Sequence, residues 1–232
     1  MKKPLNPYYF KMHYSISRYF VDEFLLQNIN LFKKNSLILD LGGMKNNKRG
    51  QFNIESFPFI IKYLNIDPKT KPDFLDDAEN IPVKNDYFDG IICSQLLEHV
   101  INPKKILKEA YRILKPSKPL LVTVPFLFRI HPDPNDYARY TDQYWEETFK
   151  EIGFENIKIK RLGTYFSVLA DMIKNGTRYL SKNKIFKIKL FWLIIVFLSG
   201  NLIRLLFAIE KNKTNNKFLN SYTTGFGISA RK

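Results

Sequence analysis

Hydrophobic residues gather in four short runs between residues 37 and 124, and more polar, helix-like segments separate them. The runs cover residues 37–41, 63–66, 90–94 and 120–124, and Ile, Leu and Val dominate them. Strands that a parallel sheet buries on both faces have such continuous apolar sequences. Helical segments between the strands are typical of crossover connections. The pattern therefore predicts an α/β fold around a mostly parallel sheet.

Further helices and strands are expected after the third run. Helices are predicted over residues 103–114 and 141–152, and Thr141 is a start signal for the second helix. A strand over residues 154–160 and a last strand over residues 222–230 complete the expected sheet.

The length and composition predict one main domain with two additions. A chain of 232 residues with 45% hydrophobic content is long enough to bury a single core without disulfide bonds. Residues 1–34 are rich in Tyr and Phe and are expected to form a helical lead-in over one edge of a ligand crevice. Residues 35–232 are expected to form the domain, with residues 163–219 as a helical hydrophobic insertion before the last strand.

Polar residues, Gly or Pro follow the predicted strands directly. Asp40, Asp67, Gln95 and Pro125 stand at or just beyond the ends of the four runs. Ligands of open parallel sheets bind beyond the carboxyl ends of the strands. These four positions are therefore expected to share one crevice.

An uncharged segment precedes the last strand and covers residues 190–203. As a helix it would span about 21 Å, which is less than the roughly 30 Å of a bilayer's hydrocarbon core. A single crossing would also place the strands over 154–160 and 222–230 on opposite sides of a membrane. We expect instead a helical hairpin, bent near residues 199–201, at a membrane surface. The alternative is an apolar cover that forms a homodimer.

The formal net charge is +15, and most of the excess is lysine spread along the whole chain. No dedicated RNA-binding module or base-flipping motif accompanies this charge, so no nucleic-acid partner is expected. A local concentration of lysines flanks the apolar segment, as expected for a segment held against anionic lipid head groups. It consists of Lys182, Lys184, Lys187, Lys189, Lys211 and Lys213.

The single cysteine and the amino-terminal residues indicate in which cellular compartment the protein is expected. Cys93 lies inside a predicted strand and has no partner for an intrachain disulfide, which favours a buried core thiol in a reducing compartment. Lys2 and Lys3 have no apolar run behind them, so no signal peptide is expected. The expected location is the cytoplasm, peripherally on the inner face of the cell membrane.

The strand-end residues resemble those of the S-adenosylmethionine-dependent methyltransferases of the Rossmann-like class. The closest resemblance is to small bacterial members associated with glycan or lipopolysaccharide biosynthesis, and it covers roughly residues 35–160 and the last strand. It implies a mostly parallel seven-stranded sheet with an antiparallel last strand and helices on both faces. It also implies S-adenosyl-L-methionine as the cofactor.

The resemblance further implies which residues bind the cofactor. In the family, an acidic residue and a glycine loop after the first strand hold the methionine part, and an acidic residue after the second strand binds the ribose. An Asp-Ala-Glu-x-x-Pro element meets the adenine, and here Asp76 competes with its neighbour for that contact. The implied cofactor-binding residues are Asp40, Gly42, Gly43, Asp67, Asp77, Ala78 and Gln95.

The Leu-Glu-His run at residues 97–99 also matches the family's motif after the third run. We interpret Glu98 and His99 as packing residues between strand and helix, with His99 a structural histidine. No metal site is expected.

The glycine loop departs from the family's Gly-x-Gly-x-Gly form. Here Gly43 is followed by a polar, basic stretch that reaches Gly50. This loop could exclude the cofactor, in which case the chain is a non-catalytic binding or scaffold protein. Alternatively, Lys45, Lys48 or Arg49 could hold the methionine carboxylate through charge-assisted hydrogen bonds, and this second reading is favoured.

A polar, aromatic loop follows the fourth run and resembles the family's acceptor loop, His-Pro-x-Pro-x-Asp-Tyr-x-Arg-Tyr-Thr. The resemblance and the near-neutral pKa of histidine make His131 the candidate general base. Asp136 is expected to orient His131 or to act in its place. The expected substrate-binding residues are Arg129, Tyr137, Arg139 and Tyr140.

Together these observations predict a methyltransferase at the membrane surface. Its expected acceptor is an oxygen or nitrogen of a glycan or lipid-linked saccharide, which rests on the resemblance and on the apolar segment. The alternatives are the non-catalytic scaffold and, less favoured, a nucleic-acid methyltransferase that uses the basic surface.

Overall fold

The computed structural model describes residues 14–45, 50–182 and 216–232, together with residues 198, 200–203, 205–206 and 208–210. Three features predicted above lie wholly or mostly outside these residues. They are the start of the lead-in, the basic residues Lys48 and Arg49, and most of the apolar segment with the lysines before it.

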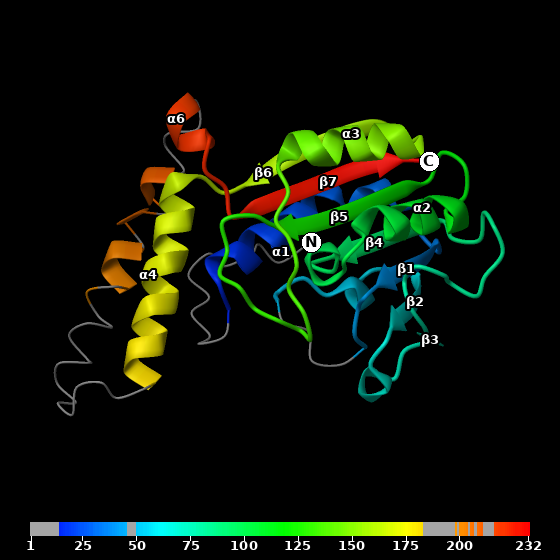
Figure 1. Ribbon diagram of the computed structural model, residues 1–232, viewed down its shortest axis with the longest axis horizontal. Helices are drawn as coiled ribbons and strands as arrows, with labels where there is room; N and C mark the ends of the chain where they lie inside the picture. Colours follow the sequence, from blue (N-terminus) through cyan, green and yellow to red (C-terminus); the bar gives the residue numbers. More distant parts are fainter. Residues whose placement is uncertain are drawn as a thin grey trace.

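The described chain forms one seven-stranded sheet in the order β3-β2-β1-β4-β5-β7-β6 (Figure 1). The strand β7 runs antiparallel to both of its neighbours, and the other neighbouring strands are parallel. The predicted fold class, a Rossmann-like sheet with an antiparallel last strand, is confirmed. The strands are β1 (Leu37–Leu41), β2 (Ile60–Asn65), β3 (Phe74–Leu75), β4 (Gly90–Ser94), β5 (Pro119–Pro125), β6 (Glu155–Leu162) and β7 (Gly225–Arg231).

Helices cover both faces of the sheet. The α-helices are α1 (Ile16–Asn28), α2 (Pro103–Ile113), α3 (Asp142–Ile152), α4 (Tyr165–Lys182) and α6 (Lys217–Asn220). Short 3-10 helices are η1 (Ile29–Leu31), η2 (Ile54–Ser56), η3 (Pro68–Thr70) and η4 (Leu97–His99). Thr141 caps α3, as predicted, and Gly153, with φ +106°, ends the helix.

Alternate residues of the strands feed two apolar layers, because successive side chains point to opposite faces. Leu39 and Leu41 of β1 pack in the layer under α2 and α3. Ile38, which directly precedes Leu39, packs in the layer under α1 with Phe24. The sheet core is therefore buried on both faces, as the continuous apolar runs predicted.

Two crossovers differ from the expected helical connections. Between β1 and β2 the described residues contain only η2, and between β2 and β4 they contain η3 and the short strand β3. In place of a crossover helix, Phe52 and Phe57 of the first connection pack against the layer that includes Ile54 and Phe24 of α1. The expectation of a helix at each crossover is wrong for these two connections.

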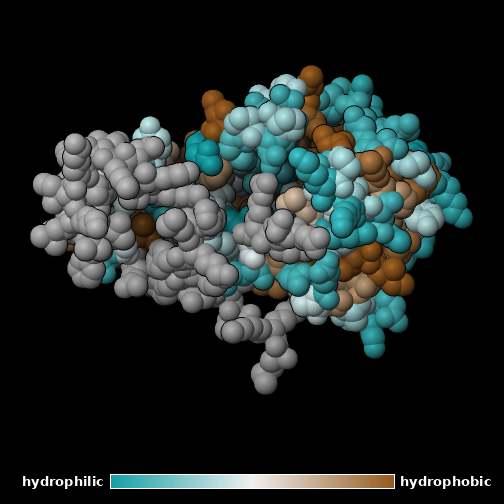
Figure 2. Space-filling view, turned by 90° about the horizontal axis from the view of Figure 1, so that it is seen from below, coloured by the Kyte–Doolittle hydropathy of each residue, from teal (hydrophilic) through white to brown (hydrophobic). Residues whose placement is uncertain are grey.

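Polar and apolar residues are mixed on the outer surface. Figure 2 shows that most of the described surface on the underside is hydrophilic, with hydrophobic residues exposed in patches. No helix within the described ranges is long and apolar enough to cross a membrane.

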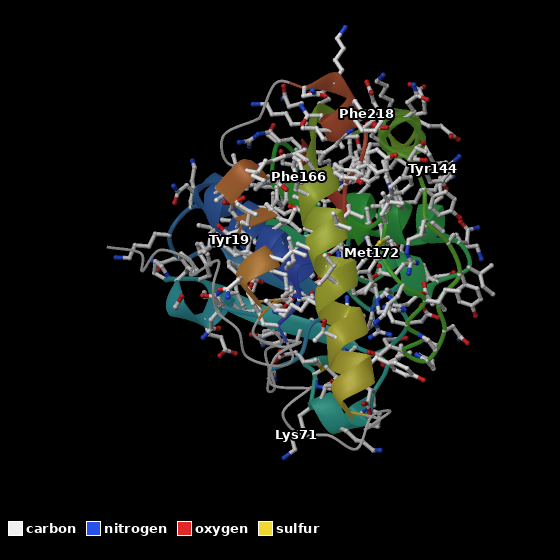
Figure 3. The ribbon with its side chains drawn as sticks, turned by 90° about the vertical axis from the view of Figure 1, so that its left-hand side faces the viewer. Tyr19, Lys71, Tyr144, Phe166, Met172 and Phe218 are labelled. Carbon is white, nitrogen blue, oxygen red and sulfur yellow. The ribbon has the colours of Figure 1, made fainter. Side chains whose placement is uncertain are left out.

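The predicted insertion begins with α4, which stands beside the end of the sheet toward which β5 points (Figure 1). Figure 3 views this side, with Phe166 and Met172 on α4 and Tyr19 on α1. Described parts of the apolar segment return to the domain, since Ile203 packs in a cluster with residues of α1 and α4. Glu210 then accepts a hydrogen bond from the backbone N–H of Thr164 (3.0 Å).

Candidate functional site

The carboxyl ends of β1, β2, β4 and β5 open into one cavity of about 1080 Å³. The glycine loop, the loops after the other three strands, and α1 all contribute to its wall. Of the four positions expected to share a crevice, Asp40, Asp67 and Gln95 line this cavity, whereas Pro125 does not and the loop after it contributes Phe128. All seven residues expected to bind a cofactor line this cavity: Asp40, Gly42, Gly43, Asp67, Asp77, Ala78 and Gln95.

The glycine loop is shaped by polar contacts from two strands. Gly42 has φ +78°, which favours glycine. The Nδ2 atom of Asn65 donates to the carbonyl oxygens of Gly42 (3.2 Å) and Gly43 (3.1 Å). A Cβ atom on Gly43 would lie 2.1 Å from Cγ of Asp40. The loop therefore needs glycine at 43 because the Asp40 carboxyl group occupies the adjacent space.

The aspartates after β2 and β3 lie on short turns. Asp67 caps η3 by accepting from the backbone N–H of Lys69 (2.9 Å), and Asp77 accepts from the N–H of Glu79 (2.9 Å). Asp76 accepts from the N–H of Asp77 (2.8 Å) but does not line the cavity. Of the two competing aspartates, only Asp77 faces the cavity.

The helix α1 forms a wall whose individual residues the sequence did not single out. Ser15, Arg18 and Asp22 line the cavity. Asp22 is buried, which raises its pKa, and it accepts from the backbone N–H of Gln51 (2.6 Å). A Cβ atom on Gly50 would lie 2.4 Å from the Asp22 carboxylate. The far end of the glycine loop is thus held against α1.

Lys45, which was expected to hold a methionine carboxylate, points to Asp73 instead. Its Nζ atom lies 3.2 Å from Oδ2 of Asp73, and Lys45 does not line the cavity. The expected partner of a methionine carboxylate is therefore paired with a carboxylate of this chain. Arg18 is a cation of α1 that does line the cavity.

The acceptor loop brings His131, Arg129 and Tyr137 to the cavity wall. The Nδ1 atom of His131 lies 3.1 Å from the carbonyl oxygen of Arg129 and 3.3 Å from Oδ2 of Asp136. Burial lowers the pKa of His131, so its neutral form is favoured.

Asp136 and Arg139 form an ion pair and do not line the cavity. The guanidinium nitrogens of Arg139 lie 2.5 and 2.7 Å from the two carboxylate oxygens of Asp136. This pairing holds the pKa of Asp136 well below its usual range. Asp136 also accepts from the backbone N–H of His131 (2.8 Å), which places it to orient His131. Tyr140 stacks on Tyr144 outside the cavity lining.

Glu98 and His99 of η4 lie beside this loop. The side chain of Glu98 is buried, and neither carboxylate oxygen has a hydrogen-bond partner. Burial raises its pKa to about 7. The Nε2 atom of His99 lies 3.6 Å from Oε1 of Glu98, and the rings of His99 and His131 are 5.2 Å apart. Sequence spacing could not reveal this group, because 32 residues separate His131 from His99.

The wall formed by α1 depends on a buried aspartate of α4. Asp171 Oδ1 accepts from the backbone N–H groups of Ile16 (2.8 Å) and Ser17 (3.4 Å) at the start of α1. Replacing Asp171 with Ala is expected to lower the free energy of unfolding by about 1–3 kcal/mol, because it leaves buried donors without an acceptor. Differential scanning calorimetry would show this as a melting temperature several degrees lower, at about 2–4 °C per kcal/mol.

The matched control is Met172→Ala, at the neighbouring residue of α4, whose side chain is 60% exposed. Its melting temperature is expected to change by about 1–2 °C at most, since exposed substitutions usually stay within ±0.5 kcal/mol. Equal melting temperatures for the two variants would contradict the anchoring role of Asp171.

A family model described as "Methyltransferase domain" matches residues 14–166 of the chain. The match begins just before α1 and ends in α4. It therefore includes β1, β2, β4 and β5 and the loops after them that line the cavity.

Individual relatives are more distant. An uncharacterized protein of Methanocaldococcus jannaschii is 31% identical over 92 residues, which cover 35% of this chain and 45% of that protein. The 2-methyl-6-phytyl-1,4-hydroquinone methyltransferase 2 of Oryza sativa is 29% identical over 99 residues, covering 38% of this chain and 26% of that protein. The chain thus spans less than half the length of either relative.

Among solved structures, a SAM dependent methyltransferase from Archaeoglobus fulgidus has a similar fold. Its TM-score is 0.58 at 16% sequence identity, and the comparison covers 93% of this chain and 94% of that one.

Proposed function

Because this chain belongs to the methyltransferase domain family, whose methyl donor is S-adenosyl-L-methionine, we propose that it methylates an oxygen or nitrogen of a small acceptor. The observation that carries the proposal is the single cavity lined by all seven expected cofactor residues and by His131. The cofactor end and the acceptor loop therefore open into the same space.

In the proposed reaction, bound S-adenosyl-L-methionine would supply its methyl group to a lone pair of the acceptor atom and would be released as S-adenosylhomocysteine, whose sulfur keeps the electron pair of the broken carbon–sulfur bond. The acceptor also loses a proton. The cofactor supplies the reactive methyl group, and the protein's part is to bind and orient the two reactants.

The chain's residues divide between the two ends of the cavity. Asp67 would accept from the ribose hydroxyls and Asp77 from the adenine edge, while Arg18 of α1, which also lines the cavity, would pair with the methionine carboxylate. At the other end, loss of the acceptor proton would depend on His131, which Asp136 orients. Arg129 and Tyr137 would contact the acceptor.

The finer proposal is that the acceptor is a glycan or lipid-linked saccharide at a membrane surface, reached by a peripheral protein. Arg129 supports an anionic acceptor, because a guanidinium binds phosphate or carboxylate well. Leu198, Leu202 and Leu205, in the described part of the apolar segment, are exposed, which supports contact with lipid or with a second copy of the chain. Recovery of all the protein in the soluble fraction without detergent would contradict membrane attachment.

The competing possibility is a non-catalytic scaffold whose glycine loop excludes the cofactor. Isothermal titration calorimetry with S-adenosylhomocysteine separates the two. Saturable binding at one site per chain is expected, and no heat of binding at high protein concentration would contradict the enzyme. Transfer of label from methyl-labelled S-adenosylmethionine to pools of saccharides and small amines or alcohols would then find the acceptor.

Asp77→Asn is expected to weaken S-adenosylhomocysteine binding by about tenfold, because a charge-assisted hydrogen bond contributes roughly 1.5–3 kcal/mol. Asparagine keeps an oxygen for the N–H of Glu79, so the turn should persist. The matched control is Asp76→Asn, next to it and outside the cavity lining, which should leave affinity within about twofold. The reverse order of effects, measured by the same calorimetry, would assign the adenine contact to Asp76.

A further inference from the structure

We propose that Glu98, His99 and His131 bind a divalent transition-metal ion at the acceptor end of the cavity. One ligand atom from each of the three residues lies within 4.8 Å of the other two. His99 and His131 also line the cavity, so a bound ion would be reachable from it. Two imidazoles and one carboxylate form a donor set that suits Zn²⁺, Mn²⁺ or Fe²⁺.

The buried carboxylate of Glu98 is the feature that points to a cation site. Its side chain is 2% exposed, and neither of its carboxylate oxygens has a hydrogen-bond partner. Burying a carboxylate without partners is costly, and buried charges are normally paired or coordinate metals. Its neighbour within reach is Nε2 of His99, at 3.6 Å from Oε1. An ion about 1 Å off the midpoint of these two atoms would lie about 2.1 Å from both, a normal coordination distance.

Both histidines are held as metal ligands usually are, with the second ring nitrogen bonded to a carbonyl oxygen or carboxylate. The Nδ1 atom of His99 lies 2.6 Å from the carbonyl oxygen of Asn135. The Nδ1 atom of His131 lies 3.1 Å from the carbonyl oxygen of Arg129. Oδ2 of Asp136 is 3.3 Å from the same nitrogen. Nη2 of Arg139 also lies near Nδ1 of His131, but at 3.4 Å it is farther away than either oxygen. The closer oxygens favour a proton on each Nδ1, which leaves each Nε2 with a lone pair for a metal.

The backbone ties the two ligand-bearing segments together. The N–H of Tyr137 donates to the carbonyl oxygen of Glu98 (2.8 Å), and the hydrogen bond of His99 Nδ1 reaches the carbonyl oxygen of Asn135 on the same loop. The loop that carries His131 is therefore fixed to η4, which carries the other two ligands. Small side-chain rotations would suffice to close the three donors around one ion.

The consequence for catalysis rests on the proposed function. An ion with three protein ligands keeps open positions toward the cavity, where an acceptor hydroxyl can bind. Binding lowers the pKa of that hydroxyl, its proton leaves to solvent, and the oxygen is then free to attack the methyl carbon. His131 would serve in this case as a ligand that holds the ion.

The test uses tag-free full-length protein, stripped with a chelator and titrated with Mn²⁺ alone and with Zn²⁺ alone by calorimetry. Electron paramagnetic resonance of the Mn²⁺ sample gives a second readout. One ion per chain is expected, with affinity reduced at least tenfold in Glu98→Gln and in His99→Asn. Asp86→Asn, at an exposed carboxylate that pairs with Lys232 and belongs to none of the three proposed ligands, is the control and should bind like the wild type.

Thermal melts of each variant exclude loss of fold as the cause, and Glu98→Gln preserves the size of the buried side chain. No stoichiometric binding to the wild type would overturn the metal site. Unchanged binding in both variants would also overturn it. Titration of the same stripped protein with S-adenosylhomocysteine separates the two proposals. Cofactor binding without metal binding defeats the metal site alone, and absence of cofactor binding defeats the proposed function.

Discussion

Replacing His131 with Ala is expected to lower turnover by about a hundredfold or more, while affinity for S-adenosylhomocysteine stays within about twofold. The imidazole lies on the acceptor loop at the cavity wall, and the seven expected cofactor residues belong to other segments. The substitution should therefore slow removal of the acceptor proton and leave the affinity for the cofactor product unchanged. Initial rates with an identified acceptor, together with calorimetry, measure the two effects separately.

Ile130→Ala is the matched control for this substitution. Ile130 precedes His131 on the same loop, and its side chain is 81% exposed. Turnover of this variant should stay close to that of the wild type. Undiminished turnover in His131→Ala would remove the histidine from the mechanism. If chelation lowers wild-type turnover and Mn²⁺ or Zn²⁺ restores it, His131 acts through a metal, whereas chelator-resistant turnover favours a direct role as base.

The sheet could be predicted from the sequence because burial on both faces leaves a simple signature. All four apolar runs became strands β1, β2, β4 and β5, although β2 begins at Ile60, three residues earlier than predicted. Ile60 and Ile61 extend the pairing with β1 at its start. The strand β3 was missed because Phe74–Leu75 has only two residues, too few for a periodic pattern.

The cofactor end of the site was predictable to the same extent. Its residues follow strands directly, so the sheet itself brings them together, and Asp40, Asp67 and Asp77 line one cavity as expected. Individual contacts within the loops were not predictable. Lys45 pairs with Asp73, 28 residues away, and this partner depends on the pairing of β2 with β3.

The roles of residues that depend on long-range packing could not be predicted from the sequence. Asp22 lies in an aromatic-rich helix, where its position among the buried residues of α1 was the available signal. Its role depends on Gln51, which folding brings to it from beyond the glycine loop. Glu98 and His99 were interpreted as packing residues because their third neighbour, His131, arrives from a different strand end.

Gly43→Ala is expected to weaken S-adenosylhomocysteine binding by about tenfold to a hundredfold. The new Cβ atom would lie 2.1 Å from Cγ of Asp40 and within 2.5 Å of both carboxylate oxygens, so the Asp40 side chain must move. A displaced carboxylate would lose the charge-assisted contact with the ligand that we propose for Asp40, and such a contact contributes roughly 1.5–3 kcal/mol. The cavity wall formed by the loop is displaced at the same time. Calorimetry measures the affinity, and circular dichroism checks the fold.

Gly176→Ala is the matched control, because a Cβ atom on Gly176 of α4 would meet nothing within 4 Å. Alanine also favours the helix by about 0.5–1 kcal/mol, so this variant should bind the ligand normally and melt slightly later. Normal affinity in Gly43→Ala would mean that Asp40 can move without cost to binding. Asp40 would then serve the turn after β1, and the cofactor's methionine part would depend on other groups of the wall, with Arg18 of α1 the next side chain to replace.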